Sequence, residues 1–486
     1  MRHRTSAAAS LAGLLAAAVA AAAATLADPA ALHGTLLVRH ARLVDGTGAA
    51  PRDDVAILIE DGRIAAIGPD AEMTGRARKT EELDVAGATV LPGLIDSHVH
   101  LEDVLGSEMR GDSPEALATL RRGQLRSHLA CGVTTVLDTA IHPEVLAEIR
   151  GWLAAGAPGP SFLTLGPPIP ARGGYMSRGY PELAVDDPGD LERNFAAAEA
   201  AGAFGVKVPI EHGFARSHIF PIHDAAVRAA IREGAAARDL PIFVHGSDEE
   251  EYAIALDMGA QVLVHANFGG LDPTPELVER LVASKAYVIT TFSIIDAELI
   301  RFDLARLDDP LTAIAVPPAE LASARDPDAW WAADAINIGF VFPWLPNIGR
   351  RMLAWYLTDE EGLRHVLDVN LRAARTLHDR GVPVVIGSDA GNFVLSQFHG
   401  TSTLRELELL AGTGIPPADV IAAATRVPAR MLRLEDQVGT VEVGKRGDLV
   451  VVRDDPLRDV GTIRRTIAWT VKSGVARTPA EWMRPE

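Results

Sequence analysis

Eight short apolar segments alternate with helical stretches along the middle of the chain, and this alternation constrains the fold more than any other feature. The stretches between the segments are mostly rich in Ala, Leu and Arg. Eight buried strands separated by helices over about 300 residues are the pattern of an α/β fold, the (β/α)8 TIM barrel, whose chemistry collects at the C-terminal strand ends. A doubly wound open sheet shares part of the pattern, but the number and length of the segments favour the barrel. The expected strands cover 94–100, 134–138, 161–166, 204–208, 241–245, 261–265, 286–291 and 383–389.

Both ends of the chain have a different sequence pattern. Short runs of alternating apolar and polar residues are broken by Asp-Gly and Gly turns, which predicts antiparallel hairpins. These runs occupy 28–91 and 438–486, and neither end is long enough to bury a sheet alone. We therefore expect the two ends to pair into one small β-sandwich. The barrel would then span 92–437, with Pro92 and Gly93 at the junction.

The connection after the seventh expected strand is unusually long. It spans about 292–382 and contains Trp330, Trp331, Trp344 and Trp355, which are four of the seven tryptophans. We expect a helical insertion here, which is either plain helix packing or a lid or oligomer contact beside the barrel.

The first 27 residues join a basic head to an Ala-rich apolar stretch that ends before Asp28. This pattern predicts a secretory signal peptide over 1–27, cleaved near Ala27, with an uncleaved membrane anchor as the alternative. We therefore expect an exported protein, periplasmic or secreted, without stable membrane insertion after signal cleavage.

The charge balance bears on the partners of the chain. With 65 acidic and 46 basic residues, the formal charge is −19. This charge repels a phosphate backbone, so we expect no nucleic acid partner. A hydrophobic fraction of 48% fits a soluble globular enzyme. The single cysteine, Cys131, allows no intrachain disulfide and is expected to be a small buried hydrophobe.

Polar residues stand in or at the end of the expected barrel strands. His98 and His100 close the first strand, and because side chains at i and i+2 point to the same face, both would project into the barrel. Neutral imidazoles and carboxylates suit a divalent ion such as zinc. Taken singly, each residue also fits a hydrogen-bonded core histidine or a helix-capping Asp. Together they indicate a metal site formed by His98, His100, Lys207, His245, His265 and Asp389.

Lys207 does not suit a metal site in its ordinary form, because an ammonium group has no lone pair. In the ammonium form, Lys207 would instead reach solvent or pair with Glu211. If Lys207 reacts with CO2, however, its carbamate is an anion on a long stem that can bridge two metals. Two dications carry +4, and one carbamate, one Asp and one hydroxide offset this to about +1. We therefore expect two divalent metal ions, with Zn2+ the leading candidate, and N6-carboxylysine at Lys207.

These residues resemble the amidohydrolase superfamily, in particular its binuclear branch related to the Xaa-Pro and Xaa-Arg dipeptidases and to imidazolonepropionase-like proteins. The resemblance covers nearly the whole mature chain. VLPGLIDSHVHL is similar to the family's first strand, VVIGSDAG to its eighth, and the stretch from STLRELELL to GKRGDLVVV to the return to the sandwich. The resemblance implies His98, His100 and Asp389 as ligands of the buried metal, His245 and His265 as ligands of the more exposed metal, and carboxylated Lys207 as the bridge.

The resemblance also implies a mechanism, from which the sequence departs at two places. A metal-bound hydroxide attacks a carbonyl, and Asp389 takes its proton and passes it to the leaving nitrogen as general acid and base. Tyr175 stands where relatives commonly carry the histidine of a Gly-Gly-His segment, and Thr403 stands where they often show another histidine. Candidate substrate contacts are Tyr175, His212 and His399, each of which also fits an ordinary loop residue.

The expected activity is hydrolysis of an amide-type C–N bond in a dipeptide, an N-acyl amino acid or a cyclic amide, so the expected partner is a small-molecule or dipeptide-sized substrate. Lactone or carbamate hydrolysis stays open, because a hydroxide that attacks a polarised carbonyl discriminates weakly between leaving groups. Deamination at a mononuclear site and a non-catalytic binding role are further alternatives. Lys207 argues against the mononuclear site, and the presence of all six residues argues against a binding protein. A homo-oligomer is a further expectation from the resemblance.

Overall fold

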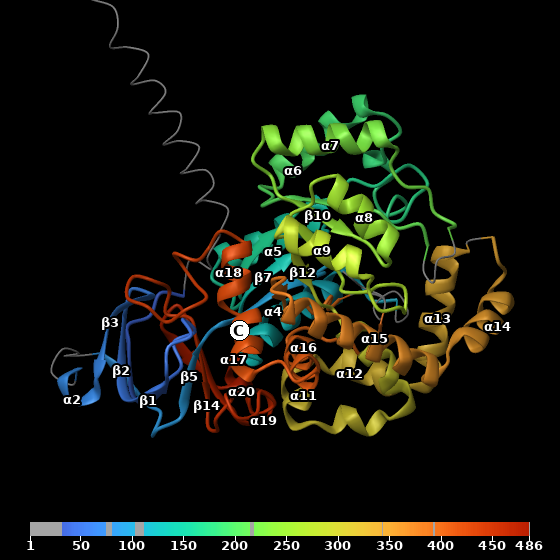
Figure 1. Ribbon diagram of the computed structural model, residues 1–486. Helices are drawn as coiled ribbons and strands as arrows, with labels where there is room; N and C mark the ends of the chain where they lie inside the picture. The colour runs from blue at the N-terminus through green and yellow to red at the C-terminus, as the bar shows by residue number, and fades with distance from the viewer. Residues whose placement is uncertain are drawn as a thin grey trace, which may run out of the picture.

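The structure is a computed structural model that describes residues 32–73, 80–102, 111–213, 218–342, 344–391 and 394–485. It consists of a barrel surrounded by helices and a sheet that lies at one side of the barrel (Figure 1). The expected signal peptide, 1–27, lies outside the described residues.

The eight expected barrel strands are all present, which confirms the predicted fold class. Each observed strand overlaps its expected range, and every neighbouring pair within the two barrel sheets is parallel. The strands are β6 (Leu94–Val99), β7 (Val133–Asp138), β8 (Ser161–Thr164), β9 (Val206–Pro209), β10 (Ile242–His245), β11 (Val262–Val264), β12 (Tyr287–Ile289) and β13 (Val384–Val385).

The barrel strands form two sheets, one of β6, β7 and β8 and one of β9 to β13, and single backbone hydrogen bonds link them at both seams. At the seam after β8, the amide of Phe204 donates to the carbonyl of Thr164 at 2.9 Å. At the seam beside β6, the amide of Asp389 donates to the carbonyl of His98 at 2.7 Å. The second seam therefore joins the first and last barrel strands at the positions of two expected metal ligands.

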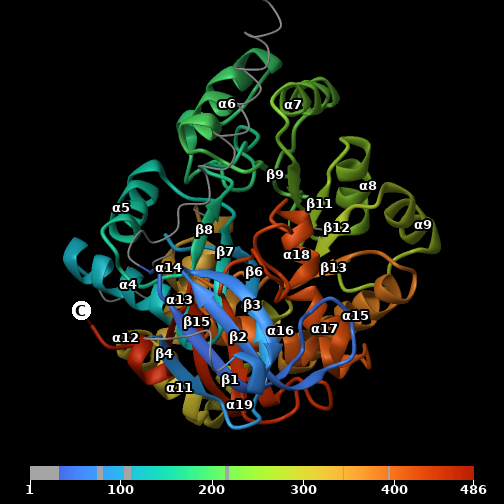
Figure 2. The same cartoon turned by 90° about the vertical axis from the view of Figure 1, so that its left-hand side faces the viewer.

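Helices cover the outside of the strands (Figure 2). In α7 (Ala225–Ala237), the buried residues Val227, Ile231 and Ala235 recur at the helical period, and the Asp224 side chain caps the first turn. The other helices around the barrel are α4 (Pro114–Ala130), α5 (Pro143–Ala154), α6 (Leu191–Ala200), α8 (Glu249–Asp257), α9 (Pro275–Ser284), α15 (Glu360–Asp379), α16 (Thr401–Gly412), α17 (Pro417–Ala423) and α18 (Arg426–Met431).

The two ends of the chain pair into one sheet. Leu449 in β14 (Leu449–Val452) is the antiparallel partner of Pro92 in β5 (Thr89–Pro92), so a C-terminal strand lies directly beside an N-terminal one. Figure 1 shows these blue and red segments side by side at the left. The remaining strands of this unit are β1 (Leu36–Leu43), β2 (Arg52–Glu60), β3 (Arg63–Pro69), β4 (Glu81–Asp84), β15 (Ile467–Lys472) and β16 (Val475–Arg477).

A buried ion pair attaches this terminal sheet to the start of β8. The Lys472 Nζ donates to Asp448 Oδ2 and to Ser161 Oγ, each at 2.7 Å, and the Lys472 side chain is 0% exposed. Removal of one partner of a buried pair leaves the other charge without compensation in a low-dielectric region.

Replacement of Lys472 by methionine is therefore expected to lower the free energy of unfolding by about 3–5 kcal/mol. Urea denaturation measures this loss. The control is Lys445→Met, whose pair with the half-exposed Glu442 is expected to contribute less than about 1 kcal/mol. Equal losses of unfolding free energy in Lys472→Met and Lys445→Met would contradict the expectation that the buried pair contributes more than the exposed one.

The connection between β12 and β13 is helical. Besides α15, it contains α10 (Ser293–Glu298), α11 (Pro310–Ala315), α12 (Pro318–Arg325), α13 (Pro327–Val341) and α14 (Asn347–Leu357). Trp330 in α13 is buried, its Nε1 donates to the carbonyl of Ala324 at 2.9 Å, and the Arg301 guanidinium lies 4.6 Å from its ring centroid. Trp344, at the turn between α13 and α14, is 76% exposed.

One further expectation concerns burial. Cys131 is buried at 0% exposure, which confirms it as a small core residue, and burial raises the pKa of its thiol to about 12. Among the described residues, the structure contains no helix with the length and hydropathy needed to cross a membrane.

Candidate metal centre

Three ligand-type atoms meet at the C-terminal end of β6. The His98 Nε2 lies 3.1 Å from the His100 Nε2, and the Asp389 Oδ1 lies 3.1 Å from the first and 3.0 Å from the second. Around a cation bound at 2.0–2.2 Å, neighbouring ligand atoms lie about 3.0–3.5 Å apart. The triangle formed by His98, His100 and Asp389 therefore has the size of one face of a coordination shell.

A second pair of imidazoles lies beside this triangle. The His265 Nε2 is 2.8 Å from the His245 Nδ1, so these two atoms converge at the ends of β10 and β11. The His265 Nδ1 is 3.8 Å from the Asp389 Oδ2, and the ring centroids of His265 and His98 are 5.0 Å apart. The two groups of ligand-type atoms are thus adjacent.

Three residues at the barrel mouth have left-handed backbone conformations that non-glycine residues rarely adopt. The φ angles are 71° for His265, 64° for Thr291 and 55° for Asp389, each shortly after the end of a barrel strand. Such conformations cost about 1–3 kcal/mol each and cluster at functional sites. The Thr291 Oγ1 lies 2.8 Å from the His265 Nδ1. The left-handed backbone therefore occurs both at a candidate ligand and at the residue whose hydroxyl contacts it.

The pKa values of His98, His265 and Asp389 suit a cation, whereas the pKa of His100 is raised, because the Asp389 carboxylate outweighs the lowering effect of burial. Burial lowers the pKa of His98 to about 3 and holds the pKa of His265 well below its usual value. Burial alone would raise the pKa of Asp389, but the neighbouring His98 and His100 hold it well below its usual value. Neutral imidazoles and an ionised carboxylate are the forms that bind metals. The donor set therefore fits a divalent metal ion.

Lys207 lies on β9 and is 1% exposed, so it does not reach solvent. Burial lowers the pKa of its ammonium group to about 8, against the opposing charges of Asp389 and Asp138. A lysine with this pKa has an appreciable neutral fraction near neutral pH, and the neutral amine is the form that reacts with CO2. The carboxylate of Glu211, the alternative partner of Lys207, lies 3.2 Å from the His245 Nε2 and accepts a hydrogen bond from the amide of Gly213 at 2.8 Å.

The supporting roles of several residues escaped the sequence analysis. Glu211 and Thr291 contact the nitrogen atoms of His245 and His265 that face away from their mutual contact, as outer-shell partners of metal-bound histidines commonly do. Asp138, at the end of β7, accepts hydrogen bonds from the amides of Leu101 at 2.8 Å and Ala140 at 3.1 Å. Like Asp389, it is an acid at the end of an apolar strand, which is the signal that could have identified it.

Thr403 lies in the interior of the protein, behind the ends of the barrel strands. It is 0% exposed, and its hydroxyl donates to the Asp96 Oδ2 at 2.6 Å. The Asp96 Oδ1 also accepts from the amides of His98 at 3.1 Å and Ser388 at 3.0 Å. Thr403 therefore supports the strand ends behind the ligands.

The three candidate substrate contacts occupy different surroundings. The ring of Tyr175 stacks on His245, with centroids 4.8 Å apart, so the structure brings Tyr175 to the centre. The His212 Nδ1 lies 3.4 Å from a Glu251 carboxylate oxygen. His399 is 2% exposed, and its Nδ1 lies 3.2 Å from the His128 Nε2. Contact with substrate stays a prediction for all three.

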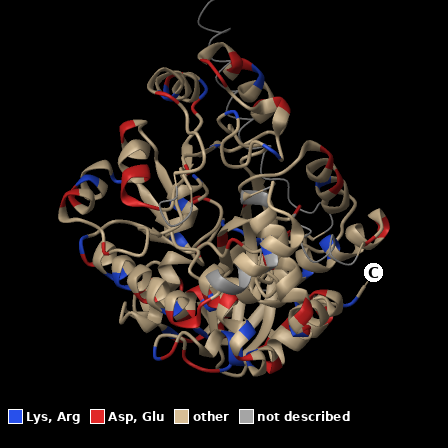
Figure 3. Ribbon diagram, turned by 90° about the vertical axis from the view of Figure 1, so that its right-hand side faces the viewer, with Lys and Arg blue, Asp and Glu red and all other residues tan. Residues whose placement is uncertain are grey.

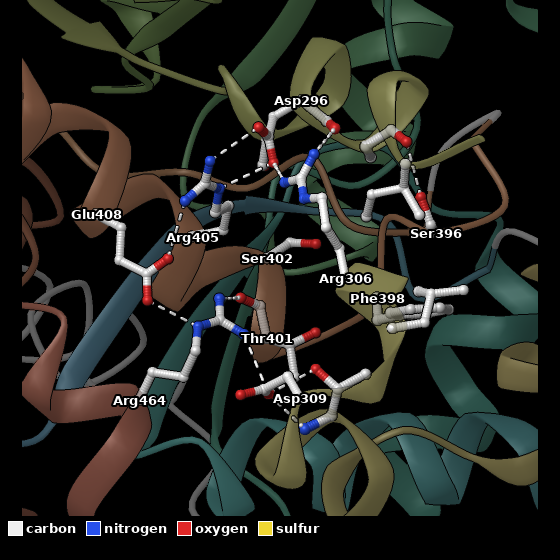
Figure 4. A pocket seen from close by; sticks show the side chains of 15 residues that line it. Asp296, Arg306, Asp309, Ser396, Phe398, Thr401, Ser402, Arg405, Glu408 and Arg464 are labelled. Carbon is white, nitrogen blue, oxygen red and sulfur yellow. Dashed lines mark hydrogen bonds and ion pairs between the residues drawn. The ribbon is translucent and has the colours of Figure 1, made fainter. Parts of the chain in front are cut away.

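A charged cavity of about 250 Å³ lies between the helical insertion and α16 (Figure 4). Arg405 forms two contacts with Asp296, at 2.9 and 3.0 Å, and Arg464 lies 2.8 Å from Glu408. Arg306 also pairs with Asp296. Every guanidinium in the cavity is paired with a carboxylate. We therefore interpret this cluster as a structural contact between the insertion and the barrel rather than as the active site.

Known proteins are similar to this chain in sequence. The sequence model of the amidohydrolase family matches residues 89–477. The imidazolonepropionase of Micrococcus luteus is 26% identical over 425 residues, covering 82% of this chain and 87% of the relative. That of Maricaulis maris is 28% identical over 430 residues, covering 84% and 88%. A 5-methylthioadenosine/S-adenosylhomocysteine deaminase of Syntrophobacter fumaroxidans is 23% identical, covering 82% and 80%.

Solved structures share the fold. A Xaa-Pro dipeptidase with bound methionine in its active site has a TM-score of 0.70 at 21% identity, covering 92% of this chain and all (100%) of that one. A molinate hydrolase has a TM-score of 0.68 at 20% identity, covering 92% and 95%. At these identities the likeness concerns the fold.

Proposed function

The chain belongs to the amidohydrolase family and is a hydrolase of carbon–nitrogen bonds, and we propose that it cleaves the amide bond of a dipeptide, an N-acyl amino acid or a cyclic amide at the centre described above. The observation that carries this proposal is the convergence of ligand-type atoms at the barrel mouth. His98, His100 and Asp389 form one group and His245 and His265 form the second.

The family is metal-dependent, and His98, His265 and Asp389 lie close enough together to hold a metal ion. We propose two divalent ions at this centre. His98, His100 and Asp389 would hold one ion, His245 and His265 the other, and Lys207 would join them as a carbamate. When bound, ions such as Zn2+ polarise a carbonyl and lower the pKa of water toward 7.

The protein's own groups have separate tasks in this proposal. Asp389 is ionised at neutral pH, and its carboxylate would accept a proton and deliver it to the leaving nitrogen. Glu211 and Thr291 orient the imidazoles of His245 and His265. Tyr175 stacks on His245 and would exclude water from one side of the substrate.

The Ala-rich segment 1–27 supports a second part of the proposal, that the chain is exported to the periplasm or beyond. Detection of a mature N-terminus near residue 28 in the extracytoplasmic fraction tests this part.

Hydrolysis of a substrate panel tests the proposed reaction. The metal-loaded protein is incubated with dipeptides, N-acyl amino acids, cyclic amides and lactones, and release of free amine or acid is followed. We expect turnover of at least one amide class that is abolished by a chelator and restored by Zn2+. Turnover of lactones alone, or turnover that is insensitive to metal removal, would contradict the proposal.

Substitution of Tyr175 tests the contact predicted at the centre. Tyr175→Leu removes the ring that stacks on His245, and we expect kcat/KM for the best panel substrate to fall about tenfold, mainly through KM. Tyr175→Phe keeps the ring and serves as the matched control, with an expected loss of less than about threefold. Equal KM values for the wild type and the Leu variant would exclude a substrate contact at this position.

A further inference from the structure

Glu406 on α16 is a buried acid that the proposed reaction does not use. Acidic and basic residues are distributed over the helices that surround the barrel (Figure 3), but Glu406 is 0% exposed. It shares one face of the helix with the buried Leu407 and Leu410. Because burial of a carboxyl group costs free energy unless hydrogen bonds compensate it, an apolar side chain would serve packing alone better. The contacts of the carboxyl group therefore indicate its role.

Both carboxyl oxygens of Glu406 accept hydrogen bonds from the segment that follows β12. The Thr290 hydroxyl donates to Oε2 at 2.6 Å, and the amide of Ser293 donates to Oε1. Burial raises the pKa of Glu406 to about 8, against the lowering effect of these hydrogen bonds, so the group is largely neutral at pH 7. Glu406 thus holds this segment by hydrogen bonds and not by charge.

The segment held by Glu406 contacts His265 and its neighbour in two ways. The carbonyl of Thr290 accepts a hydrogen bond at 3.0 Å from the amide of Ala266, which follows His265 in the chain. The hydroxyl of Thr291 lies 2.8 Å from the His265 Nδ1. Partners of this kind fix the ring orientation and the tautomer of metal-binding histidines. Glu406 therefore supports the residues that support a candidate ligand.

A second residue of α16 supports the other half of the centre. Thr403 precedes Glu406 by three positions, so the two side chains lie on the same face of the helix. The Thr403 hydroxyl donates to the Asp96 Oδ2 at 2.6 Å, and the Asp96 Oδ1 accepts from the amide of His98 at 3.1 Å. The helix thus reaches the His98 side through Thr403 and the His265 side through Glu406.

We propose that Glu406 is a positioning residue of the metal centre, which holds the imidazole of His265 in place for the ion beside His245. The proposal rests on the two-ion centre of the proposed function and assigns the support of one half to Glu406. Without the carboxyl group, the segment after β12 loses this anchor, and the His265 ring gains freedom to move. Affinity for the ion beside His245 and His265 then falls, whereas the ion at the triangle keeps its support through Thr403.

Titration of the metal-free protein with Zn2+, in competition with a chromogenic chelator, tests the proposal. Glu406→Leu removes the carboxyl group at similar volume, and we expect the dissociation constant of one of the two ions to rise about 10–100-fold, as for other outer-shell partners. Glu406→Gln keeps an oxygen and an N–H group for the same contacts and should stay within about threefold of the wild type. If Glu406→Leu does not fold, Glu406→Asp gives the same test, because its carboxyl group is one methylene farther from both partners.

Anomalous diffraction at the zinc edge identifies the ion that is lost. In Glu406→Leu, we expect a weakened peak beside His245 and His265 and an unchanged peak at the triangle. Thr403→Val removes the hydroxyl on the same helix face and should weaken the peak at the triangle instead.

Two control variants separate positioning from general stability. Glu408→Gln changes an acid on the same helix whose carboxylate contacts Arg464 at 2.8 Å in the charged cavity (Figure 4). Lys472→Met removes a buried contact at the start of β8, the strand end opposite to the ligands. Both variants should retain the zinc affinity of the wild type. Thermal melting of the metal-free proteins records the stability of each variant.

Other results overturn the proposal. If the wild type binds two ions and Glu406→Leu binds both with unchanged affinity, Glu406 has no positioning role, and the proposed reaction stands. An equal loss of both ions in Glu406→Leu, or an equal loss of affinity in Lys472→Met, also excludes the role. A wild-type protein that binds fewer than two Zn2+ ions contradicts the two-ion centre itself, and the role of Glu406 falls with it.

Discussion

Replacement of Lys207 by alanine is expected to reduce bound metal from two equivalents per chain to one or fewer and to lower kcat roughly a thousandfold, which is the size of loss seen when a key electrostatic group leaves an active site. The reason is the position of Lys207 at 1% exposure on β9, among the ligand-bearing strands. As a carbamate it would supply a negative charge to the two divalent ions of the proposed centre. As alanine it supplies neither charge nor ligand, so the two cations would repel each other across a buried site.

Chemical rescue separates the carbamate from a merely structural role. Acetate or formate added to Lys207→Ala should restore part of the metal content and part of kcat, because a small carboxylate can occupy the space left by the side chain. Lys207→Arg keeps a positive charge but forms no such carbamate, and we expect it to bind less metal than the wild type. Metal content is measured by inductively coupled plasma mass spectrometry. Full metal content in Lys207→Ala would contradict the bridging role.

Replacement of Asp389 by asparagine is expected to lower kcat roughly a thousandfold while the protein stays folded, in line with the 10²–10⁴-fold contributions of general acid–base groups. Asparagine has nearly the same shape as aspartate, but it accepts no proton and carries no charge. The Asp389 carboxylate contacts both His98 and His100 and lies 3.8 Å from the His265 Nδ1, so it is the group that faces both halves of the centre.

Asp138→Asn is the matched comparison for this substitution. Asp138 is also a buried acid at a strand end, but its oxygens accept hydrogen bonds from the backbone amides of Leu101 and Ala140. We expect its loss of kcat to stay within about tenfold, as for supporting residues around metal sites. Equal losses at the two positions, or full activity in Asp389→Asn, would exclude Asp389 as the proton-transfer group.

The strands of the barrel were predictable because each is a short apolar run that ends in a polar residue or a turn. His98 and Asp389 could be placed at strand ends from this pattern alone. Their mutual contact depends on the seam in which the amide of Asp389 donates to the carbonyl of His98, and only the barrel topology predicts that seam.

The supporting contacts could not be predicted, since they join side chains that are distant in sequence and have no common period. Thr403 donates to Asp96 across 307 positions, and Thr291 contacts His265, where both residues have left-handed backbone conformations. The sequence also suggested Glu211 as an alternative partner of Lys207, whereas the structure places the Glu211 carboxylate against His245.

Anomalous diffraction from crystals of the metal-loaded protein, recorded at the zinc absorption edge, tests the central claim most directly. The account predicts two peaks, one between His98, His100 and Asp389 and one beside His245 and His265, with carboxylate density at the end of Lys207 between them. A single peak with an unmodified Lys207, or peaks away from these side chains, would contradict a binuclear centre at the barrel mouth.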